Sequence, residues 1–321
     1  MATKPLPRSP FTSREVRLRN AVDSLLESYI KHPEIERIGT VSLPAKESII
    51  QLAEDILVML FPGLIRQESF DQLNLPYVMG QKTVSIFYRM RDALEQVLCW
   101  EASQEGQNCS ERMDFSEQVE ALVFEFLEDL PRLRDVLAED VDAIMEGDPA
   151  ATSKREVVLA YPGLQALSVF RIANYLHRRE VPLIPRILTE YVHSRFGIDI
   201  HPNAELGRGI MIDHGTGVVI GGTAIIGNHV RIYQGVTLGA LSPSKHTGHP
   251  TSKRHPTIED DVIIYSGATI LGGDTTIGKG SVIGGNVWLT HSVPPYSRVY
   301  LKDPSQYQEL HARDQGSKEM G

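Results

Sequence analysis

The residues best suited to acid–base chemistry lie in the segment IDHGTG, where Asp213 and His214 are followed by two glycines. Another carboxylate, Asp199, precedes His214 by fifteen residues. A carboxylate that orients an imidazole and stabilises its cationic form makes that imidazole a better general base. A lone histidine here would be interpreted as a surface turn residue, but the coincidence with two acids favours a function. If the fold brings Asp199 to His214, the pair can take a proton from a hydroxyl group.

The element that must position these residues is predicted by a six-residue aliphatic period in the second half of the chain. The interval widens to eight only between Ile212 and Ile220, which is where His214 lies. A hexapeptide period predicts a parallel β-helix, in which three hexapeptides form one triangular coil and stacked coils share a core. The aliphatic positions are Leu206, Ile212, Ile220, Ile226, Ile232, Leu238, Ile258, Ile264, Ile270, Ile277, Ile283 and Leu289.

The register of this period assigns each repeat to one side of the triangle. It predicts that Ile200, Ile220 and Leu238 share a side, and that Asp199 lies at the same corner as the DHGTG segment, one coil away. Neighbouring coils are separated by about 4.8 Å. We therefore expect a hydrogen bond between Asp199 and His214, with the backbone leaving the coil at flexible glycines.

A long interruption between Leu238 and Ile258 predicts a loop over residues 239–257, which ends with Arg254 and His255. Loops of this length in a compact repeat are usually functional or disordered. The corner that follows this loop is not the corner of His214. If both corners serve one site, they most simply meet between neighbouring subunits of a trimer; a solvated arm is an equally weighted alternative.

The first half of the chain has helical apolar spacing from about residue 14 to residue 196. We therefore predict an α-helical domain over 1–195, a left-handed parallel β-helix over 196–300 and a C-terminal tail over 301–321.

The net charge of −9 argues against nucleic-acid binding. No signal peptide and no transmembrane-length run is present, so we expect a cytoplasmic protein without a membrane partner. The two cysteines, Cys99 and Cys109, suggest no disulfide framework and no metal site.

Several motifs taken together resemble bacterial serine O-acetyltransferases, which belong to the hexapeptide-repeat acyltransferases. The resemblance lies in IDIHPNAELGRGIMIDHGTG, GVTLGA and KRHPTI, with GDPAATSKREVVLAYPGLQALSVFRIANYLH upstream. It extends from about Asp148 to Pro295 and spans both predicted domains. It implies transfer of acetyl from acetyl-CoA to the hydroxyl of L-serine, which gives O-acetyl-L-serine for cysteine biosynthesis.

The resemblance also implies roles for individual residues. His214 would be the general base and Asp199 its partner, while His255 would protonate or stabilise the collapsing intermediate. Serine would be bound by Asp148, Asp213, Arg254 and His255, because a zwitterion needs a carboxylate for its ammonium and a cation for its carboxylate. The acetyl-CoA ligands would be Gly239, Ala240, Ser266, Gly267 and Gln234.

The family further implies partners. L-cysteine is expected as a feedback inhibitor that occupies the serine site. The chain is expected to form a homotrimer, or a hexamer through its helical domain, and that domain also carries the serine-site loop near residue 148. The tail does not end in the isoleucine that many members insert into cysteine synthase, so that complex is in doubt. No metal is expected.

Three other functions remain open at this stage. Acetyl could pass to another hydroxyl acceptor, such as homoserine or a sugar, although the charge pair of Asp148 and Arg254 favours an amino acid. A zinc-dependent, carbonic-anhydrase-like trimer would place three imidazoles around the metal. A scaffold without catalysis would not need the DHGTG segment. The histidines that make the zinc alternative worth considering are His201, His214, His229, His246, His249 and His255.

Overall fold

The computed structural model describes residues 13–32, 35, 42–66, 70–107, 115–241 and 252–301. The chain divides into two compact units, Met1–Ser42 and Leu43–Gly321. In the described part of the first unit, the single α-helix is α1 (Ser13–Lys31). Within the described ranges, no helix has the combined length and apolarity that a membrane crossing would require.

The second unit begins with six helices, and the apolar stripes of all of them except α5 meet in a common core. Ile56 of α2, Leu94 of α3 and Phe126 of α4 are all buried in it, as their spacing predicts. The last helix, α7, ends where Gly197 adopts a left-handed conformation. The bounds are α2 (Lys46–Leu60), α3 (Leu75–Gln104), α4 (Phe115–Gly147), α5 (Lys154–Ala160), α6 (Pro162–His177) and α7 (Ile184–Phe196).

Short parallel strands then form three sheets, which are the three sides of a β-helix. The sheet orders are β1-β4-β7-β10-β13, β2-β5-β8-β11 and β3-β6-β9-β12-β14. The bounds are β1 (Ile198–Ile200), β2 (Glu205–Leu206), β3 (Met211–Asp213), β4 (Val218–Ile220), β5 (Ile225–Ile226), β6 (Arg231–Tyr233), β7 (Thr237–Gly239), β8 (Thr257–Ile258), β9 (Ile263–Ile264), β10 (Thr269–Leu271), β11 (Thr276–Ile277), β12 (Val282–Ile283), β13 (Trp288–Leu289) and β14 (Arg298–Val299).

The register of these strands is the one that the hexapeptide period predicts. Ile200 pairs with Ile220, which in turn pairs with Leu238. Ile212 pairs with Ile232 on another side. Each of these side chains is buried, because the aliphatic column fills the inside of every coil. The predicted fold class, a helical region followed by a parallel β-helix, is confirmed.

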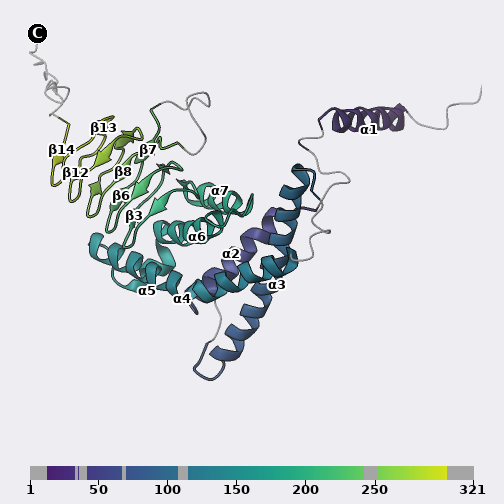
Figure 1. Ribbon diagram of the computed structural model, residues 1–321, viewed down its shortest axis with the longest axis horizontal. Helices are drawn as coiled ribbons and strands as arrows, with labels where there is room; N and C mark the ends of the chain where they lie inside the picture. Colours follow the sequence, from purple (N-terminus) through teal and green to yellow (C-terminus); the bar gives the residue numbers. More distant parts are fainter. Residues whose placement is uncertain are drawn as a thin grey trace, which may run out of the picture. The chain divides into compact units, whose positions relative to one another are not determined.

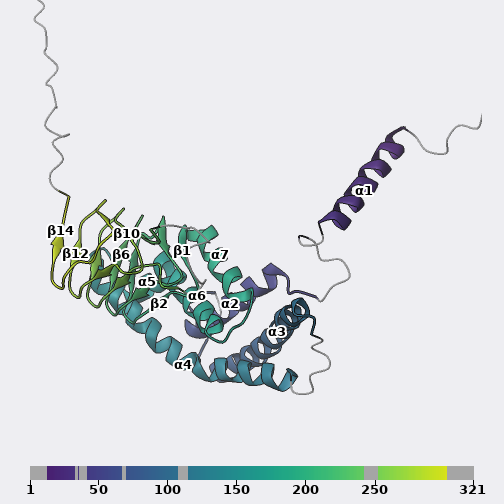
Figure 2. The same ribbon diagram turned by 45° about the horizontal axis from the view of Figure 1, so that its top comes forward.

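The helices cover the first coil of the β-helix and provide hydrogen bonds that a preceding coil would otherwise supply (Figures 1 and 2). Arg171 of α6 donates to the carbonyl of Gly207 at 2.9 Å, and Asn174 donates to the carbonyl of Ala204 at 3.0 Å. Asp140 of α4 accepts from the Ile210 N–H at 2.9 Å and forms a buried ion pair with Arg171. Backbone groups that flank β2 and β3 are thereby paired, as a stable repeat fold requires at its ends.

The predicted boundary at 195/196 lies where the elements change from helix to strand, but both kinds of element belong to the one compact unit Leu43–Gly321. The division into two domains there stays a prediction. Of the predicted loop 239–257, residues 242–251 lie outside the described residues, and so does most of the predicted tail, 302–321. The expectation that this chain does not form the cysteine synthase complex rests on that tail, so it also stays a prediction.

One expectation from the cysteines was wrong. Cys99 is disulfide-bonded in the structure. Spacing along the sequence does not give the distance between two sulfur atoms in the fold, and that distance decides whether a disulfide forms.

Candidate active site

His214 lies in the turn between β3 and β4, which we call the His214 corner. The two residues added to the six-residue period displace it from the column of inward side chains, and 69% of its side chain is exposed. Both His214 and Gly215 have positive φ angles, of 55° and 77°, so the chain here follows a path that the regular coil does not. The displaced imidazole is accessible to a substrate.

Asp213 stands directly beside this imidazole and is buried. Its Oδ1 accepts the N–H of His214 at 2.8 Å, and its Oδ2 lies 3.6 Å from Nε2 of the same residue. The backbone bond fixes one carboxylate oxygen, which leaves the other facing the ring.

Asp148 brings a second carboxylate to the same place from the end of α4. Its Oδ2 accepts the hydroxyl of Tyr161 at 2.5 Å, and its Oδ1 accepts the N–H of Ala150 at 2.8 Å. The bond from Tyr161, then the bond from Ala150 and finally the charge of His214 lower the pKa of Asp148. The carboxylate is thus ionised at neutral pH and close enough to His214 to interact with it.

Two helices reach this corner because small residues allow them to touch β3. A Cβ on Gly163, in the first turn of α6, would stand 2.0 Å from the Ile212 carbonyl oxygen. A Cβ on Gly147, the last residue of α4, would stand 2.1 Å from the sulfur of Met211. The close approach places Asp148 and Tyr161 beside the strand that carries Asp213.

Asp199 lies elsewhere than expected. It is within β1, paired with Val219, and the residue that stacks on the His214 corner is Gly197, whose carbonyl accepts the Gly217 N–H at 2.7 Å. Because Gly197 makes the turn from α7 into β1, the strand has already begun at Asp199. The expected corner position of Asp199 was therefore wrong.

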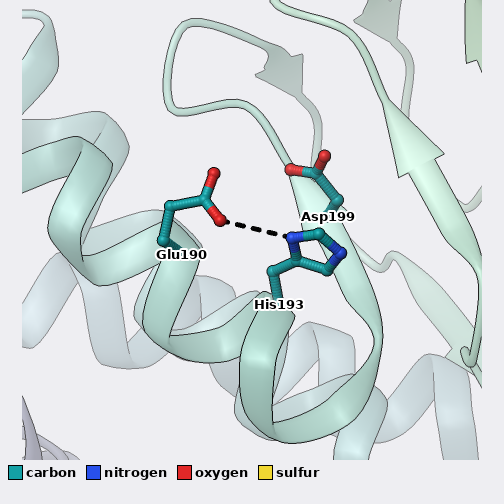
Figure 3. Close-up of side chains that lie close together, drawn as sticks. All are labelled: Glu190, His193 and Asp199. Carbon is teal, nitrogen blue, oxygen red and sulfur yellow. Dashed lines mark hydrogen bonds and ion pairs between the residues drawn. The ribbon is translucent and has the colours of Figure 1, made fainter.

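The carboxylate of Asp199 faces two residues of α7, Glu190 and His193 (Figure 3). One oxygen or nitrogen from each of the three lies within 4.8 Å of the others, and His193 Nδ1 is 3.3 Å from Glu190 Oε2. No hydrogen bond between Asp199 and His214 occurs among the described contacts, so that partnership stays a prediction.

Within the described ranges, Glu190, His193 and Asp199 are the only group with metal-ligand spacing, and this group contains none of the histidines of the zinc alternative. Two of those, His246 and His249, lie outside the described residues.

His255 and Arg254 are held at a different corner, between β4 and β5, by Thr223. The Thr223 N–H and hydroxyl lie 3.0 and 2.8 Å from His255 Nδ1, and the Thr223 hydroxyl accepts the N–H groups of Arg254 and His255. Burial, then the charges of Arg254 and His201, lower the pKa of His255 to about 4. The ring is therefore neutral, and because Nδ1 accepts the backbone N–H, its proton is on Nε2.

The candidate acetyl-CoA ligands stack on the His214 corner as expected. Gly235 donates to the Thr216 carbonyl at 3.0 Å, and Gly267 donates to the Gln234 carbonyl at 2.9 Å, so Gln234 and Ser266 continue the corner over the next two coils. Oε1 of Gln234 is buried without a hydrogen-bond partner among the described residues. Gly239 ends β7, and Ala240 follows it.

Two residues of the site were missed by the sequence argument. Tyr161 had no periodic signal, although it lies in a quoted motif directly before Pro162. Thr223 differs in no visible way from other turn residues of the repeat. Only the fold shows that each of them bonds a candidate ligand.

Comparisons with known proteins identify relatives of this chain. Residues 81–169 match the family model of the serine acetyltransferase N-terminal region. The plasmid serine acetyltransferase of Synechococcus elongatus is 42% identical over 80% of this chain and 81% of its own length.

Solved structures are similar as well. Serine acetyltransferase isoform 3 of Entamoeba histolytica, solved with cysteine, has a TM-score of 0.64 and 33% identity over 90% of this chain and 94% of its own. The serine acetyltransferase of Neisseria gonorrhoeae, solved with serine, has a TM-score of 0.51 and 25% identity over 84% of this chain and 98% of its own. The helical region, the β-helix and the relatives that share both place this chain in the serine acetyltransferase family, whose members are acyltransferases.

Proposed function

We propose that this chain transfers acetyl from acetyl-CoA to the hydroxyl of L-serine, with His214 as the general base. The observation that carries the proposal is the exposed imidazole of His214 between the carboxylates of Asp213 and Asp148. An amino-acid alcohol needs both features at one place, because its ammonium requires an anion and its hydroxyl requires a proton acceptor. O-acetyl-L-serine is a precursor for cysteine, so cysteine biosynthesis is the expected pathway.

Serine binding divides between two corners. Asp148 and Asp213 receive the ammonium group near His214. The carboxylate of the substrate serine is bound by Arg254 of the partner subunit, because within one chain the backbone of Arg254 is bonded to Thr223 at another corner. The proposed unit is therefore at least a trimer, in which each site lies between two subunits; a hexamer would join two such trimers.

The two histidines have different roles in the proposed reaction. The imidazole of His214 takes the hydroxyl proton as the serine oxygen attacks the thioester carbon. The tetrahedral intermediate then breaks its carbon–sulfur bond, and the CoA thiolate takes the proton back from His214. His255 of the partner subunit is neutral with its proton on Nε2, so we assign it to donate a hydrogen bond to the intermediate's oxyanion rather than to transfer a proton.

We keep Asp199 as the proposed partner of His214 in this cycle. The exposed imidazole would turn from Asp213 toward β1 by rotation about its side-chain bonds. Asp199→Asn and Asp213→Asn distinguish the two carboxylates. Loss of kcat at unchanged KM for serine marks the residue that stabilises the imidazolium, whereas a raised KM marks a serine ligand.

The pantetheine arm of acetyl-CoA is proposed to lie along the His214 corner. The amide groups of the arm supply N–H donors, and the buried Oε1 of Gln234 is an acceptor without a partner. Ser266, Gly267, Gly239 and Ala240 leave room for the chain beside it. L-cysteine resembles serine in shape and charge, so we propose that it inhibits by occupying the serine site.

The test is to mix the purified protein with acetyl-CoA and L-serine and to follow thiol release, with homoserine and a sugar as competing acceptors. We expect serine to be used best and His214→Ala to lose at least about 99% of turnover, as expected for removal of a general base. His291→Ala is the matched control, since His291 is an exposed histidine elsewhere on the β-helix. Full activity in His214→Ala, or none with serine in the unaltered protein, contradicts the proposal.

A further inference from the structure

A tyrosine hydroxyl is bonded to one of the proposed serine ligands. Tyr161 donates to Asp148 Oδ2 at 2.5 Å, and this bond raises the pKa of Tyr161 to about 12. Burial, Glu156 and Asp213 act in the same direction. Tyr161 is therefore protonated over the whole physiological range and is a permanent donor to the carboxylate.

The backbone around Tyr161 fixes the direction of its side chain. Tyr161 is the single residue between α5 and α6, with φ −84° and ψ 114°. Pro162 follows it, and a proline restricts the preceding residue to this extended region. Gly163 then anchors the helix start against the Ile212 carbonyl. The phenol is thus aimed from a rigid junction that contacts the strand carrying Asp213.

Asp148 is fixed from the other side by its own loop. Its second carboxylate oxygen accepts the Ala150 N–H, and its carbonyl accepts the Ala151 N–H at 3.1 Å. The loop ends where the Ser153 hydroxyl caps α5 by accepting the Glu156 N–H. Each carboxylate oxygen has two acceptor positions, so one on each oxygen remains for a ligand.

We propose that Tyr161 is a positioning residue whose hydroxyl holds the Asp148 carboxylate in the one orientation that receives the ammonium group of the acceptor substrate. This inference rests on the proposed function, in which Asp148 binds the amino acid. Without the bond from Tyr161, the carboxylate of this half-exposed residue rotates, and the ammonium group must restrict that rotation when it binds.

The experiment is a double-mutant cycle with Tyr161→Phe and Asp148→Asn, measured by steady-state kinetics and by calorimetric binding of L-serine. We expect Tyr161→Phe to raise KM and Kd for serine by about tenfold, the effect of losing a hydrogen bond to a charged group. The kcat and the KM for acetyl-CoA should stay within about twofold, because Tyr161 touches neither the reacting atoms nor the thioester. In the Asp148→Asn background the same change should have no further effect on serine binding.

Tyr191→Phe is the matched control. Its hydroxyl also donates to a carboxylate, Oε1 of Glu54 at 3.0 Å, but between α7 and α2. It should leave all three kinetic constants unchanged. An unchanged KM in Tyr161→Phe overturns the inference, as does an equal effect with Asp148→Asn present, or a fall in kcat accompanied by a lower unfolding temperature. Failure of the proposed function appears separately, as absence of serine-dependent thiol release in the unaltered protein.

Discussion

At the scale of single residues, different surroundings shift the pKa of Asp148 and of His255: hydrogen bonds act chiefly on the first, and burial acts chiefly on the second. Asp148 is kept ionised by two donors, while the buried ring of His255 is kept neutral. In the proposed site, which two subunits would share, this difference would present an anion to the ammonium group and a neutral donor to the intermediate.

The first prediction concerns the pH dependence of stability. The ordinary histidine pKa is 6.5, and in the folded chain that of His255 is lowered to about 4. The unfolded chain therefore binds the proton first as the pH falls. The stability contribution of neutral His255 is complete above about pH 6.5 and is lost between there and pH 4, which amounts to about 2 kcal/mol between pH 7 and pH 5.

Urea unfolding at pH 7 and pH 5 measures this effect. In His255→Asn the amide oxygen can still accept the Thr223 N–H, but no group titrates. We expect the variant to lose about 2 kcal/mol less than the unaltered protein over this range, whereas His291→Asn, at an exposed position, should behave as the unaltered protein does. Equal pH dependence in all three proteins would contradict the assignment.

The sequence predicts some of these residues and not others, for physical reasons. His214 and Asp213 were found because the two added residues interrupt a strict period. Asp199 was misplaced because Gly197, a helix end, occupies the corner, and periodicity says nothing about where a helix stops. Tyr161 acts across a helix junction, and such a contact depends on packing that no local pattern records.

At the scale of elements, the site depends on how closely α6 approaches β3. The hexapeptide period predicts the strands and their pairing, because every inward position must be aliphatic to fill the coil. The stripes of α2, α3 and α4 predict that these helices are buried. Neither pattern predicts the placement of α6 on the first coil. That placement depends on a glycine at position 163, because a larger side chain would collide with β3.

The second prediction tests the close contact between α6 and β3. Gly163→Ala places a methyl group 2.0 Å from a backbone carbonyl, so α6 must shift. We expect a loss of about 1–3 kcal/mol in the free energy of unfolding, as for other overpacked sites. Thiol release with serine should also fall, since Tyr161 moves with the helix.

Gly80→Ala provides the comparison, in the second turn of α3. A Cβ there meets nothing within 4 Å, so the change should stabilise the protein by about 0.5–1 kcal/mol through helix propensity alone. If Gly163→Ala is equally harmless, the close contact between α6 and β3 does not constrain the site.

At the scale of the whole molecule, the proposed serine ligands are distributed over two corners that one chain does not bring together. His214 lies between β3 and β4, and His255 is held to Thr223 between β4 and β5. A symmetric ring of identical chains can bring unlike corners together at every interface. The proposed catalytic unit is therefore the assembly.

The third prediction follows from this division. His214→Ala and Arg254→Ala should each be inactive alone, yet co-expression should restore activity. Where an intact His214 meets an intact Arg254 of the partner subunit, a complete site forms, at roughly a quarter of all interfaces after random mixing. Co-expression of His214→Ala with Asp148→Ala should restore no activity, because each site needs both residues from the same subunit. Light scattering measures the number of subunits in the assembly.

The hydrogen bonds that Arg171, Asn174 and Asp140 make to the first coil have a further consequence. Repetitive folds of this kind can in principle polymerise end to end, since each rung is a template for another. Here three backbone groups of the first coil, those of Ala204, Gly207 and Ile210, are already bonded to side chains that cannot propagate the pattern. Fibre growth through that face would have to displace these bonds.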